Sequence, residues 1–196
     1  MKRDVWIWPR RAGKDPIKKG STLMVQTRVE GFCIREATPD DVGLILAFIR
    51  ELAAYEKLTH EVVATEAVLR QSLFGERRTA EVIIGEYEGE PVAFALFFHN
   101  FSTFLGRPGI YLEDLFVKQA FRGRGLGRCV FSYLAHLAKQ RGCGRLEWWV
   151  LDWNTPAIGF YKSMQAVPMD EWTVYRITDR ALDDLSREFK HRSQSA

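Results

Sequence analysis

Residues 111–127, YLEDLFVKQAFRGRGLG, constrain the fold and the chemistry of this chain more than any other stretch. An apolar strand pattern that carries Glu113 and Asp114 leads through a short loop to glycines at positions 123, 125 and 127, and a helical pattern follows. Glycine adopts positive φ and allows close approach to the backbone. The N–H groups of such a loop and the positive end of the next helix both favour an anion. The stretch therefore predicts a site for a phosphorylated cofactor, with paired carboxylates one strand away.

Two common glycine loops do not match this spacing. A P-loop needs G-x-x-x-x-G-K-[ST], which does not occur in the sequence. A dinucleotide fingerprint needs G-x-G-x-x-G, and the glycines here fall one residue short of it. The remaining alternative is a strand-to-helix turn that binds nothing. Such a turn needs one glycine and no arginine, whereas Arg122 and Arg124 accompany these glycines.

Length and composition indicate a globular domain. The chain has 196 residues, of which 46% are hydrophobic and 27% are charged, and both values are ordinary for such a domain. We expect no membrane span, because no apolar stretch reaches the roughly 20 residues that a span requires. Cys33, Cys129 and Cys143 are odd in number and lack CxxC spacing, which favours free thiols in the reducing cytoplasm. The four histidines show no metal-ligand spacing, so we expect no metal.

The basic residues gather at the N-terminus. Residues 1–30 carry eight Lys/Arg against three Asp/Glu, a charge of +5, so the remaining 166 residues of this +3 chain carry −2. We expect residues 1–30 to form a disordered extension, because short runs of like charge are usually solvated. Nucleic-acid binding by this tail and a translation start at Met24 are the alternatives. The mildly acidic remainder suits a cationic substrate better than nucleic acid.

The periodicity of apolar residues predicts an α/β domain with a central, mostly antiparallel mixed sheet flanked by helices. Thr-Pro pairs at 38–39 and 155–156 are typical helix starts. We expect strands near 32–36, 80–87, 91–99, 110–117, 146–151 and 173–177, and helices near 38–55, 65–73, 125–141, 155–164 and from 179 onward.

The run Arg122-Gly123-Arg124-Gly125-Leu126-Gly127 after an apolar strand resembles the acyl-CoA loop of the GNAT N-acetyltransferases. The runs LAAYE (52–56), YLED (111–114), LDWN (151–154) and FYK (160–162) resemble the diamine (spermidine/spermine) and thialysine acetyltransferase branch. The resemblance covers about residues 31–185 and implies a GNAT domain over 31–190 that uses acetyl-CoA. It also implies a homodimer, to which the many aromatics at 97, 98, 101 and 104 add support.

Acetyl transfer to an amine requires a neutral amine, a polarised thioester carbonyl and a proton for the leaving thiolate. No nucleophile elbow is present, so we expect direct attack by the amine. The resemblance implies that Tyr161 protonates the coenzyme A sulfur and that Glu113 removes a proton from the amine through water. By periodicity alone Tyr161 would be a core tyrosine, and Glu113 could be a solvated bulge residue. Asp114 is expected to make a structural hydrogen bond.

The resemblance also assigns the residues around the substrates. Tyr55 and Glu56 would meet the charged tail of the amine, although a solvated helix end is the alternative. Trp148 and Trp149 should face opposite sides of their strand, one in the core and one along the substrate channel. The implied cofactor contacts are Leu115, Phe116, Val117, Arg122, Gly123, Arg124, Gly125, Leu126, Gly127, Arg128, Asn154 and Pro156.

The sequence leaves the acceptor open. A small primary amine, namely a diamine, a polyamine or a thialysine-like amino acid, suits the acidic residues best. The alternatives are a protein amine, either lysine or N-terminal, and a non-catalytic acyl-CoA-binding regulator. One departure from the family pattern is Gln165, which stands where a helix-capping glycine is usual and should strain the backbone.

Overall fold

The computed structural model of the chain describes residues 24–189. These residues divide into two units, unit 1 up to Trp149 and unit 2 from Val150 onward, and each is described by itself. Most of the N-terminal extension expected over residues 1–30, up to residue 23, lies outside the described residues.

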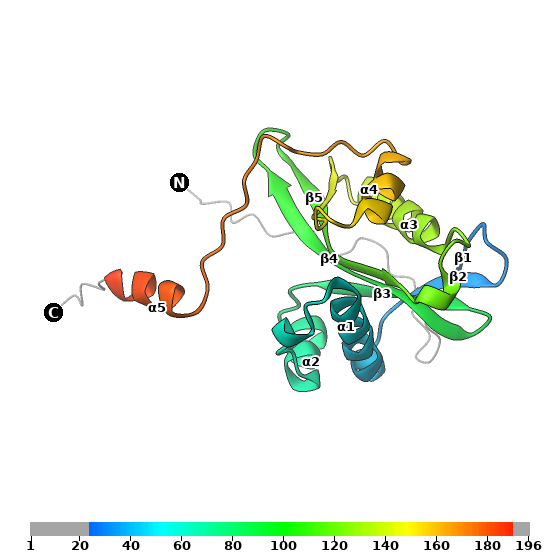
Figure 1. Ribbon diagram of the computed structural model, residues 1–196, viewed down its shortest axis with the longest axis horizontal. Coiled ribbons are helices and arrows are strands. Elements are labelled where there is room, and N and C mark those ends of the chain that lie inside the picture. The colour runs from blue at the N-terminus through cyan, green and yellow to red at the C-terminus, as the bar shows by residue number, and fades with distance from the viewer. Residues whose placement is uncertain (1–23, 190–196) are drawn as a thin grey trace, which may run out of the picture. The chain divides into compact units, whose positions relative to one another are not determined.

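Unit 1 is built on a six-stranded sheet whose strands follow one another in sequence order (Figure 1). Neighbouring strands are antiparallel, except that the last two are parallel and are connected through a helix. The expected mostly antiparallel mixed sheet with flanking helices is therefore confirmed. The strands are β1 (Val25–Gln26), β2 (Phe32–Glu36), β3 (Glu81–Tyr87), β4 (Glu90–Ser102), β5 (Arg107–Val117) and β6 (Leu146–Trp148).

Three strand predictions need correction. β1 was not expected, and it pairs with β2 through Val25 and Ile34, so the sheet begins within the stretch assigned to the extension. β6 ends at Trp148 rather than at residue 151, because it pairs with β5 at only three positions. Residues 173–177 form no strand. Their β-branched side chains favour a strand, but such a preference depends on packing against partner strands.

Helices cover both faces of the sheet in unit 1. α1 (Val42–Glu56) and α2 (Glu66–Phe74) lie on one face, and α3 (Leu126–Gln140) lies on the other (Figure 1). All three helices were predicted from the apolar periodicity. The core between the sheet and the first two helices includes Phe48, whose ring stacks on that of Phe94 with the centroids 5.2 Å apart. Phe48 also contacts Phe116, so α1 packs against the C-terminal half of β5.

β5 contains a bulge at Glu113. The partner of Leu96 on β4 is Asp114 and the partner of Phe97 is Leu112, so Glu113 is an extra residue without a partner of its own in the ladder. A bulge interrupts the ladder and re-aims the neighbouring side chains, and bulges are frequent beside active sites. The alternation of side chains along β5 therefore changes at the paired acids.

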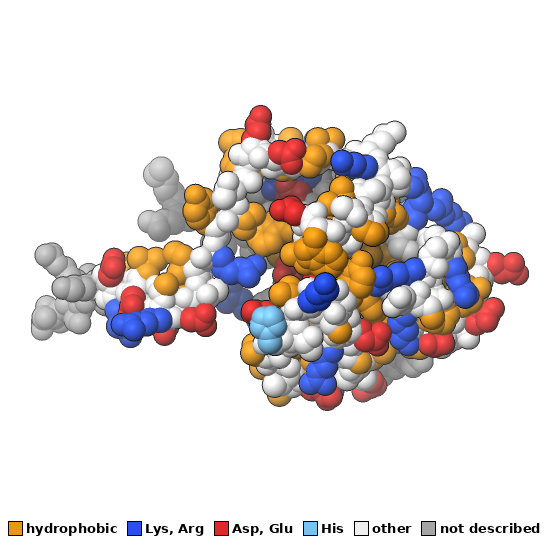
Figure 2. Space-filling model, in the orientation of Figure 1, with side chains coloured by type: hydrophobic (Ala, Val, Ile, Leu, Met, Phe, Trp, Pro, Cys, Tyr) orange, Lys and Arg blue, Asp and Glu red, His pale blue; other side chains and the backbone are white. Residues whose placement is uncertain are grey.

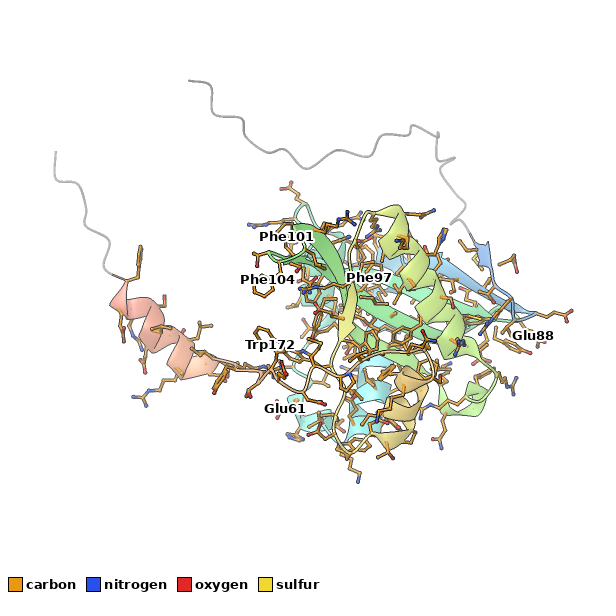
Figure 3. All side chains as sticks on the ribbon, turned by 90° about the horizontal axis from the view of Figure 1, so that it is seen from above. Glu61, Glu88, Phe97, Phe101, Phe104 and Trp172 are labelled. Atoms are coloured by element: carbon orange, nitrogen blue, oxygen red, sulfur yellow. The ribbon has the colours of Figure 1, made fainter. Side chains whose placement is uncertain are left out.

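The aromatic residues of the β4–β5 hairpin differ in exposure. Phe97 is 1% exposed and belongs to the core, whereas Phe101 and Phe104 are 61% and 92% exposed. Figure 3 shows these last two at the end of the hairpin. Of the aromatics that supported the expected homodimer, Phe101 and Phe104 are therefore accessible at the surface, whereas Phe97 is not.

Unit 2 contains two helices, α4 (Thr155–Lys162) and α5 (Asp179–Glu188). α4 begins at the predicted Thr-Pro pair, and Asn154 caps it because its Oδ1 accepts a hydrogen bond from the Ala157 N–H at 3.3 Å. The chain leaves the helix through Gln165, whose φ is +64°. The expected strain at this position is confirmed, because a side chain with a β-carbon disfavours the left-handed region.

Candidate functional site

The glycine loop presents its backbone to solvent. Gly123 and Gly125 have φ of +77° and +81°, and α3 begins at the next residue, Leu126. A β-carbon on Gly123 would meet no atom within 4 Å, and one on Gly125 would reach only Val29, at 3.9 Å. The loop therefore lies at the β1–β2 end of the sheet, where Figure 2 shows Lys and Arg side chains interspersed with Asp and Glu. An open, left-handed backbone at a helix N-terminus fits a pyrophosphate.

The two arginines of the loop lie against aromatic rings. The Arg122 Nε donates a hydrogen bond to the Val117 carbonyl at 3.0 Å, and its guanidinium carbon lies 4.3 Å from the centre of the Tyr55 ring. The guanidinium carbon of Arg124 lies 5.4 Å from the Tyr87 ring centre. Arg122 thus packs the loop against α1, and Arg124 packs it against the end of β3. Arg128 and Gly127 are in the first turn of α3, with Arg128 exposed.

The edge of β5 opens beyond its parallel neighbour. β6 pairs with β5 only as far as Leu112 and Trp148. Among residues 24–189, no other strand pairs with β5 on this side from Glu113 to Val117. This stretch contains the three expected cofactor residues Leu115–Val117. Its peptide groups are placed to pair with an extended, amide-bearing ligand such as a pantetheine arm.

A pocket of about 280 Å³ lies between the ends of α1 and β5. Its walls are largely apolar, and three carboxylates line it: Glu56 from the last residue of α1, Glu61 from the short 3-10 helix Thr59–Glu61, and Asp114 from β5. None of the described lining residues is Lys, Arg or His. The full lining is Ile49, Leu52, Ala53, Glu56, Leu58, Glu61, Val62, Val63, Ala64 and Asp114. An apolar pocket with acidic groups and no internal counter-ion suits an aliphatic cation.

Asp114 is the most perturbed acid of this site. Burial, followed by the negative charges of Glu113 and Glu56, raises the pKa of its carboxyl to about 6. Burial also raises the pKa of Glu56. The hydrogen bond expected for Asp114 is absent, since no group of the described chain donates to its carboxylate. Sequence reasoning assigned the chemical task to Glu113 and a structural one to Asp114, whereas Asp114 lines the pocket and Glu113 is exposed.

The remaining substrate residues are divided among different environments. Tyr55 stacks on Arg122 and does not line the pocket, whereas Glu56 does. The ring of Trp148 lies 4.9 Å from that of Phe131 on α3. Trp148 is therefore the one of the two tryptophans that faces the core. Trp149 is 57% exposed, and its ring contacts Tyr111 edge to face at 5.7 Å.

Three expected residues lie together on the first helix of unit 2. Tyr161 is in the last turn of α4, half-buried, with its ring centre 5.5 Å from that of Phe160. Pro156 is in the first turn, and Asn154 caps the helix N-terminus. The Asn154 side chain thus has a local structural role in addition to any contact with a cofactor.

Sequence reasoning missed Glu61. It follows Glu56 by five residues, in the segment between two helices, and such a segment has no periodicity from which a facing direction could be read. No three His, Cys, Asp or Glu residues of the described chain are grouped to hold a metal ion. Within residues 24–189, no helix combines the length and the hydropathy needed to cross a membrane.

Comparison with known proteins by family profile, by sequence and by structure finds acetyltransferases of one family. The profile of the Acetyltransferase (GNAT) family matches residues 47–165. Thialysine N-epsilon-acetyltransferase of Bos taurus is 39% identical over 164 residues, which cover 78% of this chain and 96% of the relative. L-ornithine N5-acetyltransferase NATA1 of Arabidopsis thaliana is 32% identical over 199 residues, covering 79% and 87%. Among solved structures, an integron cassette protein from the mobile metagenome of V. cholerae has a TM-score of 0.68 at 26% identity, covering 80% of this chain and 98% of that one.

Proposed function

The chain belongs to the acetyltransferase (GNAT) family, has the fold of that family and is an N-acetyltransferase related to the thialysine enzymes; on this premise, we propose that it transfers the acetyl group of acetyl-CoA to a small aliphatic primary amine. GNAT acetyltransferases use acetyl-CoA as co-substrate. The observation that carries the proposal is the pocket lined by Glu56, Glu61 and Asp114. Its carboxylates would attract an ammonium group, and its apolar wall would hold the methylene chain.

The cofactor would lie along the glycine loop and the edge of β5. The backbone N–H groups of residues 123–127 and the positive end of α3 suit the pyrophosphate, and the peptide groups of residues 115–117 suit the pantetheine arm. The acetyl thioester would then lie beside the bulge at Glu113. No metal takes part in this proposal.

The reaction proceeds by direct attack. The amine nitrogen bonds to the thioester carbon, the carbon–sulfur bond breaks, the amine loses a proton and the thiolate gains one. We propose Glu113 as the group that accepts the amine proton through water, with the Asp114 and Glu56 carboxylates holding the cationic acceptor until then. Tyr161 is the proposed donor to the sulfur, because a phenol in the Phe-Tyr-Lys frame of this family suits that step.

A panel of acceptors tests the proposal. Acetyl-CoA-dependent thiol release would be measured with 1,4-diaminobutane, spermidine, thialysine, ornithine and a lysine-containing peptide. We expect one of the small amines to give the highest kcat/KM. A chain that acetylates only the peptide would be a protein acetyltransferase instead. A chain that binds coenzyme A without turnover on any amine would be a regulator.

We also propose a cytoplasmic homodimer. The three cysteines are free and buried, which is compatible with a reducing compartment. Phe101 and Phe104, exposed at the end of the β4–β5 hairpin, are candidates for burial against a second copy. Light scattering at micromolar concentration would give twice the mass of 22.6 kDa for the dimer, and the monomer mass would contradict it.

A further inference from the structure

Arg122 connects three parts of unit 1. Its side chain starts in the glycine loop, its Nε donates to the carbonyl of Val117 at the end of β5, and its guanidinium lies over the Tyr55 ring on α1. The same guanidinium carbon is 5.5 Å from the ring centre of Phe116. A planar cation over two aromatic faces has a defined direction, which an extended lysine would not reproduce.

The residue that Arg122 contacts is joined directly to the acceptor pocket. Tyr55 precedes Glu56, and the two end α1. The helix end is closed by the Leu58 N–H, which donates to the Ala53 carbonyl at 2.8 Å, with Lys57 in the left-handed region at φ +62°. Because the two residues are adjacent in this closed turn, the position of the backbone at Tyr55 also sets the position of Glu56.

We propose that Arg122 is a positioning residue that couples the cofactor loop to the acceptor pocket through Tyr55. Its Nε donates to Val117 and the plane of its guanidinium lies on the Tyr55 ring. In this proposal the loop amides bind the phosphates, and Arg122 fixes where those amides lie relative to Glu56. Any gain in coenzyme A affinity produced by the acceptor then equals the gain in acceptor affinity produced by coenzyme A. The inference rests on the proposed function for the identity of the two ligands.

A double-mutant cycle on coenzyme A affinity tests the contact without an acceptor. Calorimetry would give the Kd of coenzyme A for Tyr55→Leu, Arg122→Gln and the double variant. We expect each single change to raise Kd about two- to five-fold, the size of an exposed cation–π contact. The Kd of the double variant should not exceed that of the weaker-binding single variant. Tyr55→Phe keeps the aromatic face and should bind like the unchanged protein. Multiplying losses would identify Arg122 as a phosphate ligand and overturn the proposal.

Steady-state kinetics test the coupling. With the best amine of the panel, Tyr55→Leu should raise the KM of the amine several-fold and leave kcat within about two-fold, and Tyr55→Phe should restore KM. A loss confined to kcat, or equal losses in Tyr55→Phe and Tyr55→Leu, would contradict the inference. Failure of the proposed function is recognised separately, because the unchanged protein would then bind no coenzyme A or turn over no small amine.

Discussion

The carboxylate of Glu56 at the end of α1 lines the same pocket as that of Asp114 on β5, and its negative charge helps to raise the pKa of Asp114. The two acids are 58 positions apart in the chain. They meet because Phe48 on α1 packs against Phe94 and Phe116 of the sheet. Two acids with raised pKa values beside an apolar wall are an unfavourable arrangement in the folded protein, which a bound cation would relieve.

Asp114→Asn should therefore stabilise the protein at neutral pH. The pKa of Asp114 is about 6 in the folded state, above the ordinary value of about 3.9. Below pH ~4 the carboxyl is mostly neutral in the folded and the unfolded state, so the substitution does not change the free energy of unfolding through this charge. As the pH rises from about 4 to about 6, only the unfolded state loses the proton, so the unchanged protein loses stability. Above this window we expect the variant to be more stable by about 1–3 kcal/mol.

Urea unfolding at pH 4 and pH 7.5 measures this difference. The matched control is Asp170→Asn, at an exposed position of unit 2, which should change stability little at either pH. The amine KM of Asp114→Asn should rise at the same time, since the pocket loses a charge. Equal stability of Asp114→Asn and the unchanged protein at pH 7.5 would contradict the inference that the charged Asp114 carboxylate destabilises the folded state.

Glu113→Gln should lower the pKa of Asp114, because the Glu113 charge is the second largest cause of its elevation. If charged Asp114 holds the amine, the acidic limb of the kcat/KM profile should move to lower pH in this variant. The rate should fall as well, more at low pH, where the amine is cationic and its proton is harder to remove. Glu88→Gln, a change of the same type at the β3–β4 turn (Figure 3), provides the control and should leave the profile in place. If the acidic limb of the kcat/KM profile does not shift in Glu113→Gln, Glu113 does not act on the acceptor site.

The parts of the site that could be predicted from sequence are those encoded locally. The left-handed Gly123 and Gly125, the helix that follows them and the strained Gln165 each depend on a few neighbouring residues. The stacking of Arg122 on Tyr55 joins segments 67 positions apart, and no short pattern encodes it. That Asp114 rather than Glu113 lines the pocket could not be predicted, because simple strand alternation does not anticipate the bulge at Glu113.

Gly125→Val should abolish coenzyme A binding. Valine disfavours the φ of +81° at this position and places a branched side chain on the surface where the pyrophosphate would approach. Gly142→Val is the matched control, since Gly142 has a φ of +69° and open space around a β-carbon but follows the other end of α3. Both variants should lose similar stability, and only Gly125→Val should lose affinity by calorimetry. Unchanged affinity in folded Gly125→Val would refute the loop assignment.

Tyr161→Phe should lower kcat while leaving the Kd of acetyl-CoA nearly unchanged. The substitution removes one hydroxyl and keeps the ring that contacts Phe160, so the packing of α4 should persist. A lost general acid typically slows the reaction about 10²–10⁴-fold, so kcat should fall within that range. Tyr175→Phe, at a tyrosine that is 91% exposed, makes the same chemical change outside α4 and should have no effect on kcat. Stopped-flow or steady-state measurement of thiol release with the best amine would give kcat for both variants. Full turnover by Tyr161→Phe would mean that the thiolate leaves without this donor or takes its proton elsewhere, and the catalytic assignment would then be wrong even with the fold and the cofactor loop unchanged.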